Sequence, residues 1–195
     1  RATCVPRVAQ SYGRWQALSG LTFTRVQSGA NVWDDGAAFP GSAGAAGLRG
    51  DCRVGGHNID GASNILAYCY FPQTGACVMD TSDAASNFAQ AANSNRFLRN
   101  TVGHEFGHGI GLNHVCPVNQ TKLMEPFLTT AFDGPRQDET RAAQAFYGDP
   151  YEDNNTAATA KPIGAVVAGT PVTFGTPPAP VSGTSDTNSA RLSID

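Results

Sequence analysis

The stretch "TVGHEFGHGIGLNH", Thr101 to His114, holds three of the four histidines of this 195-residue chain. Its apolar residues Val102, Phe106 and Ile110 recur four positions apart. At about 100° per residue this spacing places them on one face of an α-helix. We therefore predict a helix over residues 94–112 whose apolar face packs into the core.

Two histidines of the stretch share the opposite face of this helix. His104 and His108 are also four apart, offset from the apolar stripe by two residues, or roughly 200°. Two imidazoles one turn apart can hold a single metal ion from the same side. Glu105 lies beside them and is within reach of a water bound to that ion.

Glycines interrupt the helical pattern, although each interior Gly weakens a helix by about 1 kcal/mol relative to Ala. Gly111 has a clear role, because a residue with positive φ ends a helix abruptly and lets the chain turn back. That turn would bring His114 to the first two histidines as a third ligand. Gly107 and Gly109 leave two readings open: they admit a close neighbour, or they are simply tolerated.

This ligand set predicts hydrolytic chemistry. Three neutral imidazoles leave one position of a tetrahedral zinc open for water, whose pKa then falls to about 7. Glu105 is the predicted general base on that zinc-bound water and the carrier of its proton to a leaving amine. The sequence therefore predicts a zinc-dependent hydrolase with one catalytic Zn²⁺.

The remaining elements follow from hydrophobic periodicity and turn signals. Strand-like segments precede the later helices, which indicates an α+β domain. Beyond the helix over 94–112, we predict helices over 5–18 and 136–148, the last ended by Gly148, strands over 21–26, 64–71 and 76–81, and irregular chain over 34–51 and 116–135.

The motif H-E-x-x-H-x-x-G-x-x-H in this stretch resembles that of the metzincin metalloproteases. The segments "GRWQALSGLTFTRV", "TKLMEPF" and "RQDETRAAQAFYGD" resemble the matrixin branch, the fold of matrix metalloproteases. The resemblance implies a zinc-dependent endopeptidase with a twisted, mostly parallel sheet, an active-site helix and a C-terminal helix. Met124 matches the family's Met-turn residue beneath the metal, and Pro126 matches the proline two positions later.

By the same resemblance, "NILAYCYF" would form the upper rim of a cleft and pair with an extended peptide substrate. The stretch from Phe127 to Pro135 would wall the pocket for the residue after the scissile bond. Val115, where matrixins usually have Ser, departs from the family's pattern.

A second metal is expected from the resemblance. Asp60, Asp80 and Asp83 match calcium-binding carboxylates of the matrixins, and Ca²⁺ prefers such hard oxygen ligands. Solvated loop aspartates are the alternative. The family's structural zinc is not expected, because its ligand positions are occupied here by Arg53, Gly55, Tyr68 and Val78.

Composition divides the chain near residue 149. Residues 1–149 form the expected matrixin-like domain, in which the family's first strand is not found before the first helix. Residues 150–195 begin with a polar linker and continue in short apolar segments broken by Pro and Gly. "YEDNNTAATAKPIG" resembles the opening of bacterial pre-peptidase C-terminal domains. We therefore expect an incomplete all-β module here.

The five cysteines are Cys4, Cys52, Cys69, Cys77 and Cys116. No CxxC pair occurs, which favours a secreted protein with one or two disulfides over a cysteine zinc site. Free thiols in a cytosolic protein are the alternative. Cys69–Cys77 is the first pairing to expect, since the two flank a short strand connection. Cys4 lies within the first helix, so a latency role like that of the matrixin cysteine is not expected.

The formal net charge is −3 and no Lys/Arg cluster occurs, so we expect neither a nucleic-acid partner nor an anionic membrane surface. No apolar run approaches the roughly 20 residues that cross a bilayer. The expected partner is a protein or peptide substrate bound by a monomer. Two other functions are weighed: a non-catalytic binding or adhesion module on the metzincin scaffold, and a zinc hydrolase for short peptides or cell-wall cross-links.

Overall fold

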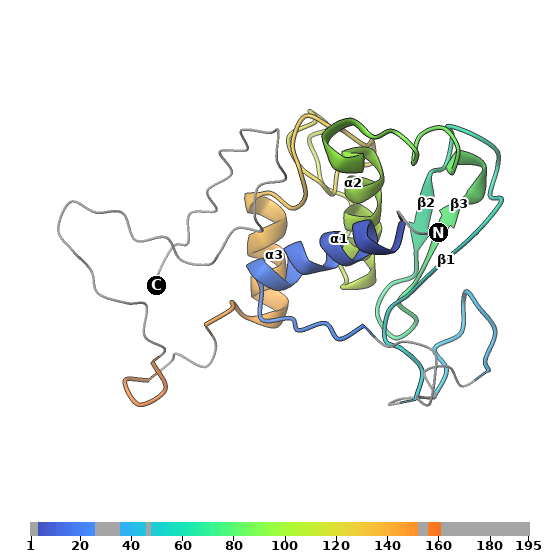
Figure 1. Cartoon of the computed structure of the whole chain (residues 1–195). Coiled ribbons are helices and arrows are strands. Elements are labelled where there is room, and N and C mark those ends of the chain that lie inside the picture. The colour runs from blue at the N-terminus through green and yellow to red at the C-terminus, as the bar shows by residue number, and fades with distance from the viewer. Residues whose placement is uncertain (1–3, 26–35, 46–47, 152–155, 161–195) are drawn as a thin grey trace.

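The structure, a computed structural model, describes residues 4–25, 36–45, 48–151 and 156–160. Its elements in chain order are α1 (Cys4–Leu18), β1 (Arg53–His57), β2 (Ala67–Cys69), β3 (Ala76–Asp80), a 3₁₀ turn (Thr81–Asp83), α2 (Ala92–Gly109) and α3 (Gln137–Tyr147). Figure 1 shows α2 between the small sheet and α3, with α1 crossing beside it. The predicted α+β class is confirmed in this part of the chain.

The core forms where α1, α2 and α3 meet. Trp15 of α1 is fully buried, and Phe106 of α2 contacts it edge-on with ring centroids 6.2 Å apart. The Trp15 indole N–H donates to the Gly103 carbonyl at 3.1 Å. The remaining buried members of this cluster are Ile110, Leu112, Leu123, Met124, Phe132 and Ala143. The predicted apolar face of α2 is therefore the face that packs into the core.

The sheet is mixed rather than mostly parallel, which corrects the expectation. Its strand order among the described residues is β1-β3-β2, with β1 parallel and β2 antiparallel to β3. Strand β1 was missed, because "RVGGH" lacks a side-chain alternation that would mark it. Strand β2 lies at an edge of the sheet and contacts α2.

The predicted strand over 21–26 is wrong for residues 21–25, and residue 26 lies outside the described part. The Phe23 N–H is bound by the Gln16 side-chain oxygen at 2.8 Å instead of a neighbouring strand. The Phe23 ring packs on Tyr12 and Phe106, with centroids 5.6 and 5.0 Å away. Side-chain packing, with no partner strand among the described residues, explains the strand-like pattern of this segment.

Two further boundaries differ from the expectation. The strand predicted over 64–71 covers only 67–69, because the Ile65 N–H bonds to the Asp60 carboxylate rather than to a strand. The helix predicted over 94–112 ends at Gly109 and contains left-handed residues at 93–95. The Arg99 guanidinium holds that kink by donating to the carbonyls of Asn93 and Ser94. The helices at both ends of the domain agree with prediction, and Gly148 caps α3 with φ of 72°.

A disulfide joins Cys69 and Cys77, which confirms the first expected pairing. The two residues are cross-strand neighbours in β2 and β3. The Cys69 sulfur lies against α2 at Gly109, where an added Cβ would come within 3.2 Å of it. Cys4, Cys52 and Cys116 are free thiols. The disulfide thus ties the edge strand to the sheet beside the end of α2.

The expected β module falls almost wholly on residues 152–155 and 161–195, which lie outside the described part of the chain. In the part that is described, no helix combines the length and apolar character needed to cross a bilayer.

Candidate active site

Three histidines converge at one end of α2. The Nε2 atom of His114 lies 3.1 Å from Nε2 of His104 and 3.2 Å from Nε2 of His108. Among the described residues these three form the one cluster of His, Cys, Asp or Glu with metal-ligand spacing. The turn that brings His114 back has Gly111 at φ of 100°. The motif's central geometric prediction therefore agrees with the structure.

The end of α2 is a Schellman motif, which explains the abrupt turn. The Leu112 N–H bonds to the Gly107 carbonyl at 2.9 Å, and the Gly111 N–H bonds to the His108 carbonyl at 2.9 Å. These two bonds satisfy carbonyls that a helix end would otherwise leave unpaired. Gly111 supplies the left-handed residue that this motif requires.

Backbone carbonyls hold two of the imidazole rings in one tautomer. Nδ1 of His104 lies 2.7 Å from the Leu123 carbonyl, and Nδ1 of His108 lies 2.7 Å from the Leu112 carbonyl. A carbonyl only accepts, so each Nδ1 carries the proton and each Nε2 presents a lone pair. Burial lowers the pKa of His104 to about 4 and also lowers the pKa of His108. Both rings are therefore neutral near pH 7.

These residues fit a tetrahedral zinc ion. Zn–N bonds of 2.0–2.1 Å at tetrahedral angles separate the nitrogens by about 3.3–3.4 Å. The observed Nε2 separations of 3.1 and 3.2 Å are close to this value. His104 and His108 both present an Nε2 lone pair at this point, so a cation that accepts them is the natural partner. A backbone carbonyl that accepts from Nδ1 is likewise typical of zinc-binding histidines.

Glu105 is buried beside this cluster, with 7% of its surface exposed. Burial raises its pKa to about 8. Its Oε2 atom has no hydrogen-bond partner within the described part of the chain. A buried carboxyl with a free oxygen and a raised pKa is suited to take up and release a proton near neutral pH.

Met124 lies directly beneath the histidine-bearing turn of α2. Its side chain is 1% exposed, and its carbonyl accepts from the Val115 N–H at 3.0 Å, next to His114. An added Cβ on Gly107 would lie 2.3 Å from the Met124 sulfur. The open question about Gly107 is thus resolved, since this glycine makes room for Met124. Pro126, matched to the same turn, is exposed.

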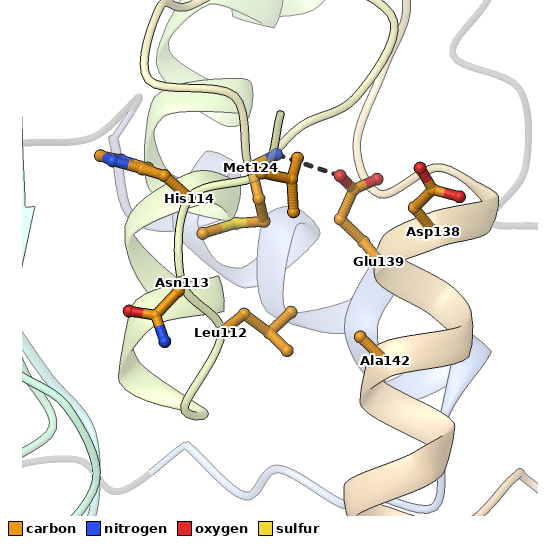
Figure 2. A pocket seen from close by; sticks show the side chains of 8 residues that line it. Leu112, Asn113, His114, Met124, Asp138, Glu139 and Ala142 are labelled. Atoms are coloured by element: carbon orange, nitrogen blue, oxygen red, sulfur yellow. Dashed lines mark hydrogen bonds between the residues drawn. The ribbon is translucent and has the colours of Figure 1, made fainter. Parts of the chain in front are cut away.

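Behind His114 the returning chain packs against α3. Figure 2 shows a small pocket there, lined by Leu112, Asn113, His114, Val115, Met124, Asp138, Glu139 and Ala142, with the His114 ring directed away from α3. The Glu139 carboxylate bridges the two segments. It accepts from the Met124 N–H at 3.1 Å and from the Arg136 N–H at the start of α3 at 2.8 Å.

The chain after the Met-turn is held by a polar face of α2. Asn100 is fully buried; its amide donates to the carbonyls of Thr129 and Phe132, and its oxygen accepts from the Gly134 N–H, each at 2.9 Å. Arg99 pairs with buried Asp133 at 2.9 Å. This segment is the one expected to wall the substrate pocket, and these contacts fix its backbone.

The aspartates expected to bind calcium surround one loop. Asp80 and Asp83 are fully buried. Asp80 accepts from the backbone N–H groups of Asp60 and Ser82, and Asp83 accepts from that of Ser63. Burial acts to raise the pKa of Asp80, but these bonds outweigh it and lower that pKa. The structure does not bring the three carboxylates together as it does the histidines.

A helix with two histidines on one face, a sharp turn to a third and a methionine beneath them are together the features of a metalloprotease domain of the metzincin type. Residues 1–148 match the matrixin family, peptidase family M10. The chain therefore belongs to the matrixins.

Three relatives illustrate this similarity. Mouse stromelysin-3 is 30% identical over 145 residues, covering 73% of this chain and 27% of its own length. Human matrix metalloproteinase-17 is 34% identical over 132 residues, covering 63% of this chain and 20% of its own length. The hatching enzyme of Paracentrotus lividus is 27% identical over 157 residues, covering 80% of this chain and 24% of its own length. The chain thus spans about a quarter of the length of these relatives.

Sequence reasoning missed the groups that support the ligands. The carbonyls of Leu112 and Leu123 leave no side-chain signal. Glu139 was detectable, because it occupies the third position of α3, where a glutamate closes a capping box. Glu125, adjacent to Met124, is a further buried carboxylate that the sequence analysis did not single out.

Two glycines of α2 provide a matched test of the packing beneath the histidines. Gly107→Ala should lower the free energy of unfolding by about 1–3 kcal/mol, because its Cβ would collide with the buried Met124 sulfur. Gly103→Ala should be neutral or add up to about 1 kcal/mol, since its Cβ would meet only Leu123 at 3.4 Å. Denaturant unfolding of both variants measures this, and equal effects would contradict the account.

Proposed function

We propose that this chain carries the catalytic domain of a secreted zinc-dependent endopeptidase. The convergence of three Nε2 atoms beside a buried carboxyl oxygen that has no hydrogen-bond partner among the described residues is the observation that carries the proposal. His104, His108 and His114 would hold the zinc ion. When bound, zinc supplies a Lewis acid that acidifies water and polarises a carbonyl group.

Glu105 would move the proton during peptide hydrolysis. Its free Oε2 accepts a proton from the attacking water and then delivers it to the nitrogen of the leaving amine. The backbone carbonyls bound to His104 and His108 would keep the two rings in place during this transfer.

The substrate would lie along β2 as an added antiparallel strand. Support comes from the position of β2 at the edge of the sheet and from its contact with α2. Phe71, just after β2, packs edge-on against the His108 ring with centroids 5.8 Å apart. The segment Phe127–Pro135, held through Asn100, would wall the pocket for the residue after the cut.

Secretion is supported by the Cys69–Cys77 disulfide, since such bonds persist in oxidising compartments. Residues 150–195 would begin a second, β-sandwich module of the pre-peptidase C-terminal kind. We expect the domain to act as a monomer on protein or peptide substrates, without nucleic acid or membrane as partners.

Calcium binding at Asp60, Asp80 and Asp83 is a separate proposal. It is supported by Asp83, whose buried Oδ2 has no hydrogen-bond partner within the described residues. Ca²⁺ binds six to eight oxygens, and loop carbonyls beside these carboxylates would complete such a set.

The catalytic proposal predicts that Glu105→Ala abolishes peptide cleavage, with a loss of about 10²–10⁴-fold or more, while zinc content is unchanged. Cleavage of a peptide library by the wild type should also stop with a zinc chelator and return with added zinc. Activity retained by Glu105→Ala would contradict the proton-transfer role. A wild type that binds zinc and peptides but cleaves none would favour the alternative, a non-catalytic binding module.

The calcium proposal predicts that Ca²⁺ at about 100 times its Kd raises Tm by about 5–10 °C. Asp83→Asn should remove this shift, because it replaces the unpartnered carboxylate oxygen. Differential scanning fluorimetry with and without chelation of Ca²⁺ measures it. No shift in the wild type would mean that the three aspartates only brace the loop through its backbone N–H groups.

A further inference from the structure

Glu125, between Met124 and Pro126, is a buried carboxylate that binds backbone N–H groups of the preceding loop. Glu125 is fully buried, yet its carboxylate accepts four backbone hydrogen bonds. Oε2 is 2.7 Å from the Asn119 nitrogen and 2.6 Å from that of Gln120. Oε1 is 2.8 Å from the Thr121 nitrogen and 3.0 Å from that of Lys122.

These four consecutive N–H groups form a concave anion site in the loop between His114 and the Met-turn. Gln120 has a positive φ of 61°, which turns its neighbours' N–H groups toward one point, as in other backbone nests. The Lys122 ammonium lies 3.9 Å from Oε1. Burial acts to raise the pKa of Glu125, but the four backbone bonds outweigh it and lower that pKa. Glu125 is therefore an ionised carboxylate that closes this loop on itself.

The closed loop ends at the group that orients a histidine. Lys122 is followed by Leu123, whose carbonyl lies 2.7 Å from His104 Nδ1. Glu125 thus fixes the chain on both sides of this carbonyl: through Lys122 before it and by its own backbone after it. His108 differs, since its Nδ1 bonds to Leu112, which is outside this loop.

We infer that Glu125 is a positioning residue for the metal centre: it holds the Leu123 carbonyl against His104 and so fixes the ring and tautomer of that ligand. This inference rests on the proposed zinc site. Removing the charge loosens the loop, because a neutral amide in its place keeps one accepting oxygen and presents an NH₂ group to N–H donors. Loss of a group that holds a metal ligand in place lowers metal affinity by about 10–100-fold.

The test compares Glu125→Gln with the wild type and with Asp51→Asn, which makes the same carboxylate-to-amide change at an exposed position. Zinc affinity is measured by competition with a chromophoric chelator. We expect Glu125→Gln to bind zinc about 10–100-fold more weakly and Asp51→Asn to match the wild type. Glu125→Asp, which keeps the charge, should fall between them and replaces the Gln variant if that variant does not fold.

A second readout uses zinc-free protein and is independent of the proposed function. In ¹⁵N NMR, the Nδ1–H signal of His104 should exchange faster with solvent in Glu125→Gln, while that of His108 is unchanged. Equal changes at both rings, or none, would overturn the inference, as would unaltered zinc affinity. If the wild type itself bound no zinc, the proposed function would fail, and the contrast between the two rings would still decide the role of Glu125.

Discussion

The arrangement on which the rest depends is the approach of three imidazole nitrogens to one point, with Nε2 separations of 3.1 and 3.2 Å. Two of these rings, His104 and His108, present Nε2 lone pairs at this point, and lone pairs that face one another repel, so the fold itself must hold the rings in place. It does so with backbone carbonyls on two rings and a Schellman turn before the third. These hydrogen bonds and this turn hold the three nitrogens close to one point.

The turn that contains Met124 supports the histidines from beneath α2. Met124 fits beneath α2 because Gly107 has no side chain, and three separate contacts hold its segment: Val115, Glu139 and the loop closed by Glu125. Two of these contacts use buried carboxylates to bind backbone N–H groups. A charged acceptor forms stronger hydrogen bonds than a neutral one, so irregular chain can be held here without regular secondary structure. Glu105 is a third buried carboxyl of the domain, and its Oε2 has no hydrogen-bond partner among the described residues.

The sequence predicted the parts that depend on local spacing. The buried stripe of α2, the convergence of His114 through Gly111 and the end of α3 at Gly148 follow from helical periodicity and the conformational freedom of glycine. Parts that depend on distant chain were not predictable in this way. Residues 21–25 are strand-like yet have no partner strand in the described part of the chain, and β1 exists only because β3 pairs with it. The roles of Leu112 and Leu123 depend on carbonyl groups, which every residue has.

The central claim is that three imidazoles and no thiol hold one zinc ion, and zinc K-edge X-ray absorption of the zinc-loaded chain tests it most directly. The account predicts nitrogen or oxygen neighbours at about 2.0–2.1 Å, with imidazole scattering from three rings. Cys4 and Cys116 are exposed free thiols and provide the competing ligands. A sulfur neighbour at about 2.3 Å, or scattering from only two imidazoles, would contradict the account.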